Sequence, residues 1–160
     1  MTKATRKIHL PQIGDEQLKL LERLSNACAV SGDEGEVRKI VLEEVRPYTD
    51  EVKVDTLGNV LATKRSSVER PLRVMVAAHM DEVGLMLTSD EGEGIYRFES
   101  VGGTSVYDFS GNVMWVGKEH IPGVIGLKPI HLLEPAEIKR QFTVDSLRLD
   151  VDPATGKVKI

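Results

Sequence analysis

The amino-acid sequence predicts an α/β protein whose second half is a small β-barrel or sandwich. Helical periodicity dominates the N-terminal third, a hairpin pattern and an apolar run follow, and then short β-rich segments alternate with glycine turns. We therefore expect residues 1–88 to form an α/β layer, residues 89–146 to form a separate β domain, and residues 147–160 to return to the first part.

Two amphipathic helices are predicted at the start of the chain. In DEQLKLLERLSNACA, residues 15–29, leucines recur at helical spacing and acidic residues stand first, where the helix dipole favours them. Cys28 is expected on the buried side of this helix, and as the single cysteine it cannot form an internal disulfide. Ser31-Gly32 marks a break, after which an apolar stripe that ends just before a proline predicts a second helix over residues 33–46.

Extended structure is predicted next. The segment EVKVDTLGNVLATKR, residues 51–65, alternates apolar and polar residues on both sides of Gly58-Asn59 and is typical of a β-hairpin. The run RVMVAA, residues 73–78, is too continuously apolar for a half-exposed strand, so it predicts a buried strand.

The β domain is predicted from short runs such as LMLTS, IYRFES, NVMWVG and GVIGL, which glycine-rich turns separate. Trp115, at the centre of NVMWVG, is expected in the barrel core or in an interface. At the end of the chain, LRLDV and KVKI flank the turn signal DPATG and predict a further hairpin over residues 147–160.

Charge and hydropathy exclude two classes of partner. The net charge of −4 and the lack of clustered lysine and arginine argue against nucleic-acid binding. No segment approaches the roughly 20 apolar residues of a membrane span, and no apolar region follows the basic N-terminus. We expect a cytoplasmic protein that binds neither nucleic acid nor membrane.

A compact polar group interrupts the apolar stretch RVMVAAHMDEVGLML, residues 73–87. His79 stands two positions before Asp81, so strand-like backbone would place both side chains on one face, where the carboxylate can orient the imidazole or share its ligand. These residues permit two interpretations: a metal ligand supported by a carboxylate, or a structural histidine at a strand end with Asp81 and Glu82 facing water.

Several motifs, in order along the chain, resemble the M42 family of dinuclear metal aminopeptidases, within the wider group of zinc exopeptidases. They are SGDEGEVR, VKVDTLGNVLA, AAHMDEVGLML, VGG at residues 101–103 and PGVIGLKPIHLL at residues 122–133. The resemblance runs from about Leu18 to Leu133 and implies part of a zinc-exopeptidase-like α/β catalytic layer with an inserted, dimerisation-type β-barrel domain.

The resemblance also implies roles for individual residues. His79 matches the family's first metal-binding histidine, and Asp81 matches the acid that hydrogen-bonds this histidine and fixes its tautomer. Glu82 is given no catalytic role. The family's reaction is hydrolysis of the N-terminal peptide bond, in which two divalent cations, such as zinc or cobalt, activate a water while a glutamate moves the proton.

The resemblance places the bridging aspartate, the glutamate base and the remaining metal ligands beyond the inserted domain, after which this sequence ends. His9, His120 and His131 are expected to be surface or loop residues rather than ligands. We therefore expect the N-terminal portion of a peptide-hydrolysing aminopeptidase, inactive alone, whose partners are peptide substrate, further copies of itself or a complementary C-terminal half. The alternative is a non-catalytic oligomerisation or regulatory module derived from that family.

Overall fold

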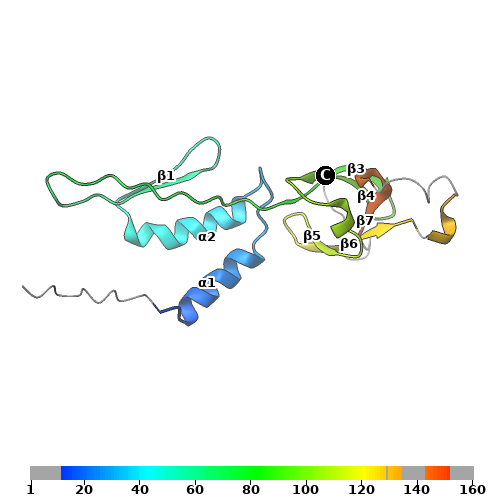
Figure 1. Ribbon diagram of the computed structural model, residues 1–160, viewed down its shortest axis with the longest axis horizontal. Helices are drawn as coiled ribbons and strands as arrows, with labels where there is room; N and C mark the ends of the chain where they lie inside the picture. The colour runs from blue at the N-terminus through cyan, green and yellow to red at the C-terminus, as the bar shows by residue number, and fades with distance from the viewer. Residues whose placement is uncertain (1–11, 129, 135–142, 152–160) are drawn as a thin grey trace, which may run out of the picture. The chain divides into compact units, whose positions relative to one another are not determined.

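A computed structural model describes residues 12–128, 130–134 and 143–151 (Figure 1). The chain divides into two compact units. Unit 1 combines Met1–Ala27 with Glu36–Leu72, and unit 2 combines Cys28–Gly35 with Arg73–Ile160. We describe each unit separately.

Unit 1 holds the helices and the hairpin that the sequence predicts. Its elements are α1 (Asp15–Asn26), α2 (Gly35–Val45), the short 3-10 helix η1 (Arg46–Tyr48), β1 (Glu51–Val54) and β2 (Val60–Thr63). The strands pair antiparallel, with Val52 opposite Ala62. Among the described residues, no helix has the length and apolarity that crossing a bilayer would require.

Polar contacts join the elements of unit 1. The guanidinium of Arg23 on α1 donates to Glu43 and Glu44 on α2, at 2.7 and 2.9 Å. On the other side of α2, Arg38 Nε donates to the carbonyl of Gly58 in the hairpin turn, at 2.7 Å. Gly58 has φ of +87°, and a Cβ there would lie 2.3 Å from the Arg38 guanidinium. The positive φ favours glycine here, and a Cβ would in addition displace the Arg38 guanidinium.

Helix α1 ends earlier than the sequence predicts. Its C-cap, Ala27, has extended backbone with ψ of 137°. Cys28 therefore lies beyond the helix and is half-buried, so its expected place on the buried face of a helix is wrong.

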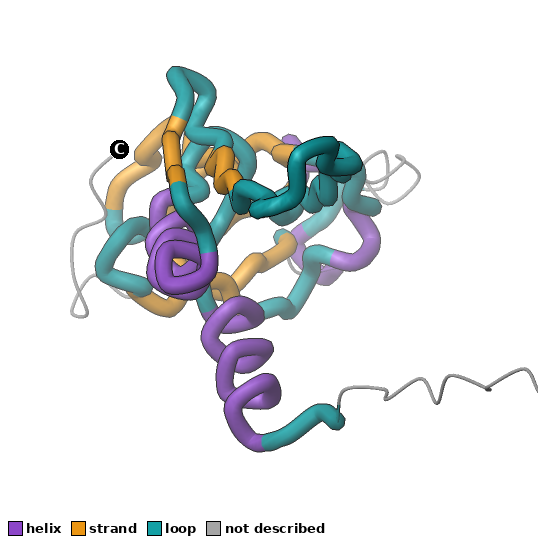
Figure 2. Tube along the Cα trace, turned by 90° about the vertical axis from the view of Figure 1, so that its left-hand side faces the viewer, coloured by secondary structure: helices purple, strands orange, loops and turns teal. Residues whose placement is uncertain are grey.

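The prediction of a buried strand over residues 73–78 is also wrong for the described structure. This stretch has no regular secondary structure, and it lies in the long connection between β2 and β3, green in Figure 1 and drawn as loop in Figure 2. Val74, Met75 and Val76 are 76%, 89% and 92% exposed. A strand needs a neighbour for its backbone hydrogen bonds, and no strand among the described residues pairs with this segment.

Unit 2 contains a β domain, as the sequence predicts. Among its described residues, one antiparallel sheet has the order β3-β4-β7-β6-β5, formed by β3 (Gly84–Gly92), β4 (Ile95–Val101), β7 (Leu147–Val151), β6 (Ile121–Leu127) and β5 (Val113–Val116). Short 3-10 helices, η2 (Val106–Asp108), η3 (Ile130–Leu132) and η4 (Val144–Ser146), lie in the connections. Over the residues that the structure describes, the sheet is a curled half-barrel with β3 and β5 as its edges.

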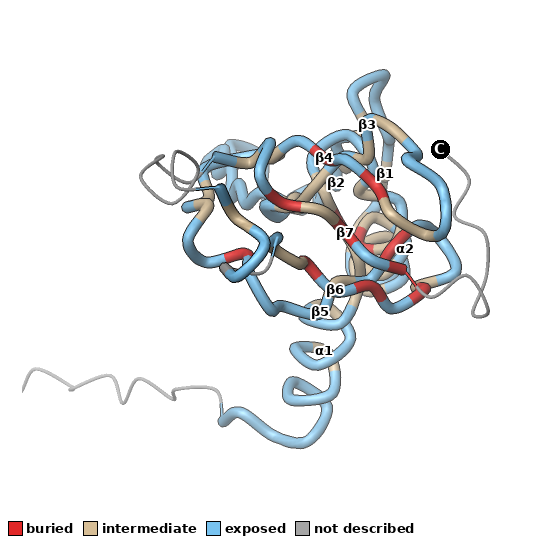
Figure 3. The backbone as a smooth tube through the Cα atoms, turned by 90° about the vertical axis from the view of Figure 1, so that its right-hand side faces the viewer, coloured by how far each residue is buried: buried red, intermediate tan, exposed pale blue. Residues whose placement is uncertain are grey.

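The core of unit 2 lies on one face of this sheet. The buried positions of this unit, red in Figure 3, concentrate on β4, β6 and β7. The least exposed side chains are those of Ile125, Leu147, Leu149 and Val151, at 1–2%. Alternate residues of these strands face this core, as a period of two requires.

The element bounds differ from the expected divisions of the chain. Strand β3 continues without a break across the boundary expected at 88–90. Leu147–Val151, expected to lead back toward the first part, pairs with both β4 and β6 and so lies inside the sheet. The hairpin predicted around DPATG lies, apart from this strand, outside the described residues.

Trp115 is not a core residue. Along β5 the exposure alternates, and Trp115 is 60% exposed whereas its neighbour Val116 is 4% exposed. Its ring stacks on the imidazole of His120, with centroids 6.3 Å apart. The apolar character of NVMWVG is therefore shared between an inner and an outer face of the sheet.

A carboxylate fastens three adjacent strands of unit 2. Glu91 on β3 accepts from Arg148 Nε on β7 at 2.7 Å and from Arg97 Nε on β4. The hydrogen bond from Arg148 is the main cause that holds the pKa of Glu91 below its ordinary value, and Arg97 adds to it against the opposing effect of desolvation. A carboxyl whose folded pKa is depressed stabilises the fold above its unfolded pKa, and this contribution is lost as pH falls through the folded value.

We predict that Arg148→Met raises the pKa of Glu91 toward its ordinary value. The free energy of unfolding should then decrease less as the pH is lowered. The ¹³C shift of the Glu91 carboxyl, followed through an acid titration, measures this change. Arg70→Met removes the same charge from an exposed position in unit 1 and should leave the Glu91 titration unchanged. An unchanged midpoint in Arg148→Met would contradict the assignment.

Candidate metal-binding site at His79

The segment that carries His79 is anchored by the N-terminal stretch of unit 2. Val30 and Glu82 form a parallel bridge, and the Glu82 N–H donates to the Ala29 carbonyl at 2.8 Å. In return, Ala29 N–H donates to Glu82 Oε1 at 3.1 Å. A Cβ on Gly84 would lie 2.4 Å from Val30, so the close approach requires glycine. Glu82 thus fixes two chain segments together.

His79 donates a hydrogen bond to the backbone of Asp81. Its Nδ1 lies 2.9 Å from the Asp81 carbonyl oxygen. A carbonyl can only accept, so Nδ1 carries the proton, and in the neutral imidazole Nε2 then keeps its lone pair. The side chain of His79 is 85% exposed, so Nε2 is accessible to a ligand. The geometry suits coordination of a divalent cation through Nε2.

The carboxylate of Asp81 supports the same imidazole from a second direction. Asp81 Oδ1 lies 3.3 Å from His79 Nδ1, farther than the Asp81 carbonyl. Asp81 Oδ2 accepts from the hydroxyl of Ser31 at 2.5 Å. The Ser31 hydrogen bond is the main cause that lowers the pKa of Asp81, with smaller contributions from the backbone and from His79, while desolvation opposes them. Asp81 is therefore an anion at neutral pH.

The structure brings together His79 and Asp81 as the sequence predicts, and it adds Ser31. The sequence indicates Ser31 only as part of a break between two helices. Its contact with Asp81 spans 50 positions of the sequence, and no periodicity or local motif indicates such a contact.

The other histidines lie elsewhere. His120, with φ of +50°, lies in the turn between β5 and β6, and His131 is an exposed residue of η3. His9 is outside the described residues. Of the two, His120 thus lies in a turn and His131 in a short 3-10 helix.

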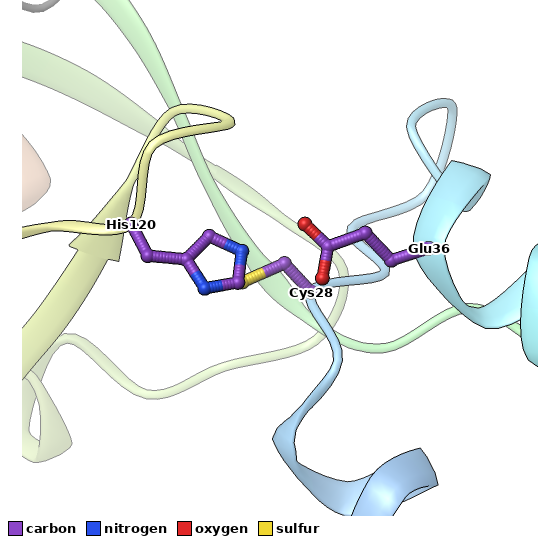
Figure 4. A group of neighbouring side chains, drawn as sticks. All are labelled: Cys28, Glu36 and His120. Atoms are coloured by element: carbon purple, nitrogen blue, oxygen red, sulfur yellow. The ribbon is translucent and has the colours of Figure 1, made fainter.

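Figure 4 shows Cys28, His120 and Glu36. Cys28 and His120 both belong to unit 2, and Cys28 Sγ lies within 4.8 Å of a ring nitrogen of His120. Glu36 belongs to unit 1, and we assign no metal site to these residues.

The described residues supply one ligand position at His79 rather than a whole metal centre. Within them, His79 belongs to no group of three histidine, cysteine or acidic side chains close enough to hold one ion. A zinc site takes three or four protein ligands. A metal centre at His79 would therefore need further ligands besides the described neighbours of this residue.

The sequence of the chain matches a known protein family. The sequence model described as M42 glutamyl aminopeptidase matches residues 58–157, more than half of the chain and a stretch that includes His79 and Asp81. The chain belongs to the M42 peptidase family. The resemblance found in the motifs is thereby confirmed.

Individual M42 relatives agree with the match. A glutamyl aminopeptidase of Lactococcus lactis subsp. cremoris is 37% identical over 126 residues, which cover 76% of this chain and 35% of the relative. The solved TET aminopeptidase of the marine sediment archaeon Thaumarchaeota archaeon SCGC AB-539-E09 superposes with a TM-score of 0.77 at 34% identity, over 90% of this chain and 42% of that one.

A third relative, the TET1 peptidase of Pyrococcus horikoshii, superposes with a TM-score of 0.68 at 30% identity, over 84% of this chain and 40% of that one. That peptidase can assemble into a tetrahedron or a large octahedral shell. The present chain spans between 34% and 39% of the length of the curated relatives that it matches. These matches confirm the α/β fold class.

Proposed function

We propose that this chain is the N-terminal portion of an M42-type metal aminopeptidase, which removes residues from the N-termini of peptides. Membership of the family supports this activity. The observation that carries the proposal is the hydrogen bond from His79 Nδ1 to the Asp81 carbonyl, because it leaves Nε2 unprotonated and exposed for a divalent cation.

In this proposal, His79 is a metal ligand through Nε2, and Asp81 orients the imidazole and fixes its tautomer. Two divalent cations, zinc or cobalt, would polarise the scissile carbonyl and acidify a water. One imidazole does not discriminate among such metals. The part of the chain that precedes β3 would belong to the catalytic domain, and the sheet of unit 2 to the inserted domain.

We further propose that the 160-residue chain is inactive by itself. Its described residues provide His79 and Asp81, but no group of ligands around them that could hold two ions. Because the chain spans about two fifths of its relatives, the bridging carboxylate, the base and the other ligands would come from the part of the family's length that these 160 residues do not cover.

The proposed partners are a peptide substrate, this C-terminal polypeptide and further copies of the chain, and the proposed compartment is the cytoplasm. The shells of the Pyrococcus horikoshii relative support self-assembly. A second candidate function is a non-catalytic oligomerisation or regulatory module. The exposed apolar side chains of Val74, Met75 and Val76 favour it, because exposed apolar residues are suited to contact with another chain.

Zinc titration of the ¹⁵N-labelled chain tests the metal-binding role of His79. We predict that zinc shifts the Nε2 resonance of His79 while Nδ1 keeps its proton, since that proton is donated to the Asp81 carbonyl. Exposed His131 serves as the reference histidine. If His79 nitrogens stay unchanged at zinc concentrations that shift His131, His79 is not a metal ligand.

A further inference from the structure

We infer that Ser31 is a positioning residue for the histidine proposed to bind metal. Its hydroxyl fixes the Asp81 carboxylate, which together with the Asp81 carbonyl holds the His79 imidazole as the Nδ1–H tautomer. This inference rests on the proposed role of His79 and adds a residue to it.

Successive contacts connect the side chain of Ser31 to that of His79 through Asp81. Ser31 Oγ donates to Asp81 Oδ2 at 2.5 Å, and the hydrogen bond is charge-assisted because its acceptor is a carboxylate. With Oδ2 held, the other oxygen, Oδ1, lies 3.3 Å from His79 Nδ1. The Asp81 carbonyl accepts from the same nitrogen at 2.9 Å. The imidazole is thus supported by one residue, and the carboxylate of that residue is oriented by Ser31.

The backbone holds Ser31 in place for this contact. Ala29, two positions earlier, is 2% exposed and exchanges two hydrogen bonds with Glu82. Just after Ser31 the chain turns at Gly32, with φ of +94°, and Asp33 N–H donates to the Val30 carbonyl at 2.7 Å. The hydroxyl is therefore presented by a fixed turn, and little side-chain ordering is needed when a ligand binds at His79.

Removal of the Ser31 hydroxyl should leave the His79 imidazole less firmly oriented, while its hydrogen bond to the Asp81 carbonyl remains. In Ser31→Ala the Asp81 carboxylate can rotate away from Nδ1, whereas the Asp81 carbonyl remains as an acceptor. The population of the Nδ1–H tautomer should fall, and Nε2 should be protonated more often. Loss of an outer partner of a metal-binding histidine lowers metal affinity by roughly 10–100-fold, and we expect about tenfold here because the carbonyl is retained.

Three variants of the full chain test the inference. Ser31→Ala removes the hydroxyl, and Ser31→Thr keeps one. Ser146→Ala is the matched control, because Ser146 Oγ also makes an exposed hydrogen bond in unit 2, to the Thr143 carbonyl at 2.6 Å. The readouts are the ¹⁵N shifts of His79 near pH 8.5, where an imidazole is neutral, and the zinc affinity measured at the same nitrogens.

We expect wild type, Ser31→Thr and Ser146→Ala to show His79 mainly as the Nδ1–H tautomer, and Ser31→Ala to shift toward Nε2–H with about tenfold weaker zinc binding. Unchanged tautomer populations in Ser31→Ala would overturn the inference. If Ser31→Ala perturbs the amide resonances around Ala29, Ser31→Cys, whose thiol is a weaker donor of similar shape, provides the same comparison.

Failure of the proposed function gives a different result. If zinc never shifts His79 in wild type, His79 is not a metal ligand, whereas a tautomer change in Ser31→Ala would still show that Ser31 positions the imidazole. If zinc shifts His79 equally in wild type and Ser31→Ala, the metal-binding role stands and the role of Ser31 is wrong.

Discussion

The purified 160-residue chain, supplied with excess zinc or cobalt, is expected to hydrolyse no aminoacyl-p-nitroanilide above background. Dinuclear hydrolysis needs a carboxylate that bridges the cations and a base that takes the proton of the water. A positioned base alone contributes about 10²–10⁴-fold to the rate. The described residues offer His79 and Asp81, and no group of three ligands that includes them.

Turnover is expected only after addition of a complementary polypeptide, for example the separately produced C-terminal part of a longer M42 relative. The assay therefore compares the chain alone, the complementary part alone and their mixture. Turnover by the isolated chain would contradict the proposal. If the mixture is inactive although the two polypeptides associate, the second candidate, a non-catalytic module, is favoured.

Ile125→Ala is expected to destabilise the β domain of unit 2 severely. Ile125 on β6 lies opposite Leu149 on β7, and the two side chains are 1% and 2% exposed. Truncation of such a side chain removes buried surface and leaves a cavity, at a cost of about 2–5 kcal/mol. Total stabilities of domains are about 5–15 kcal/mol, so this loss is a large fraction of the whole.

Urea unfolding of the two variants Ile125→Ala and Val124→Ala measures this effect. Val124 is the preceding residue of β6 and is 45% exposed, so its truncation should change the unfolding midpoint little. Both variants leave the charge of the chain unchanged. Equal midpoints for the two variants would show that Ile125 does not lie in a packed core.

Periodicity predicted the elements whose sequence pattern is local. The helices of unit 1 and the hairpin around Gly58 were predicted because their patterns repeat within a few residues. Residues 73–78 were predicted wrongly because an apolar run indicates that a strand can be buried, but burial also requires a partner strand. Val76, at 92% exposure, has no such partner among the described strands. The core position, one of the two expected for Trp115, is wrong because the alternation along β5 places its side chain on the outer face.

At the candidate site, too, the sequence predicts the contact between neighbouring residues and misses the contact between residues that are distant in the sequence. The proximity of His79 and Asp81 follows from their spacing of two positions, whereas their roles in metal binding are implied only by the resemblance to the M42 family. The carbonyl of Asp81 is the nearer acceptor, and a backbone group has no signature in a sequence. Ser31 was missed because only the folded chain brings it to Asp81 from 50 positions away.

Aminopeptidase turnover in the mixture with a complementary C-terminal polypeptide, measured with His79→Ala and His120→Ala chains in parallel, tests the role of His79 most directly. Both variants remove one imidazole from unit 2. His79 is the histidine that donates Nδ1–H to the Asp81 carbonyl. We predict that His79→Ala abolishes turnover and that His120→Ala retains it. Robust turnover with His79→Ala would show that the metal-binding site lies elsewhere.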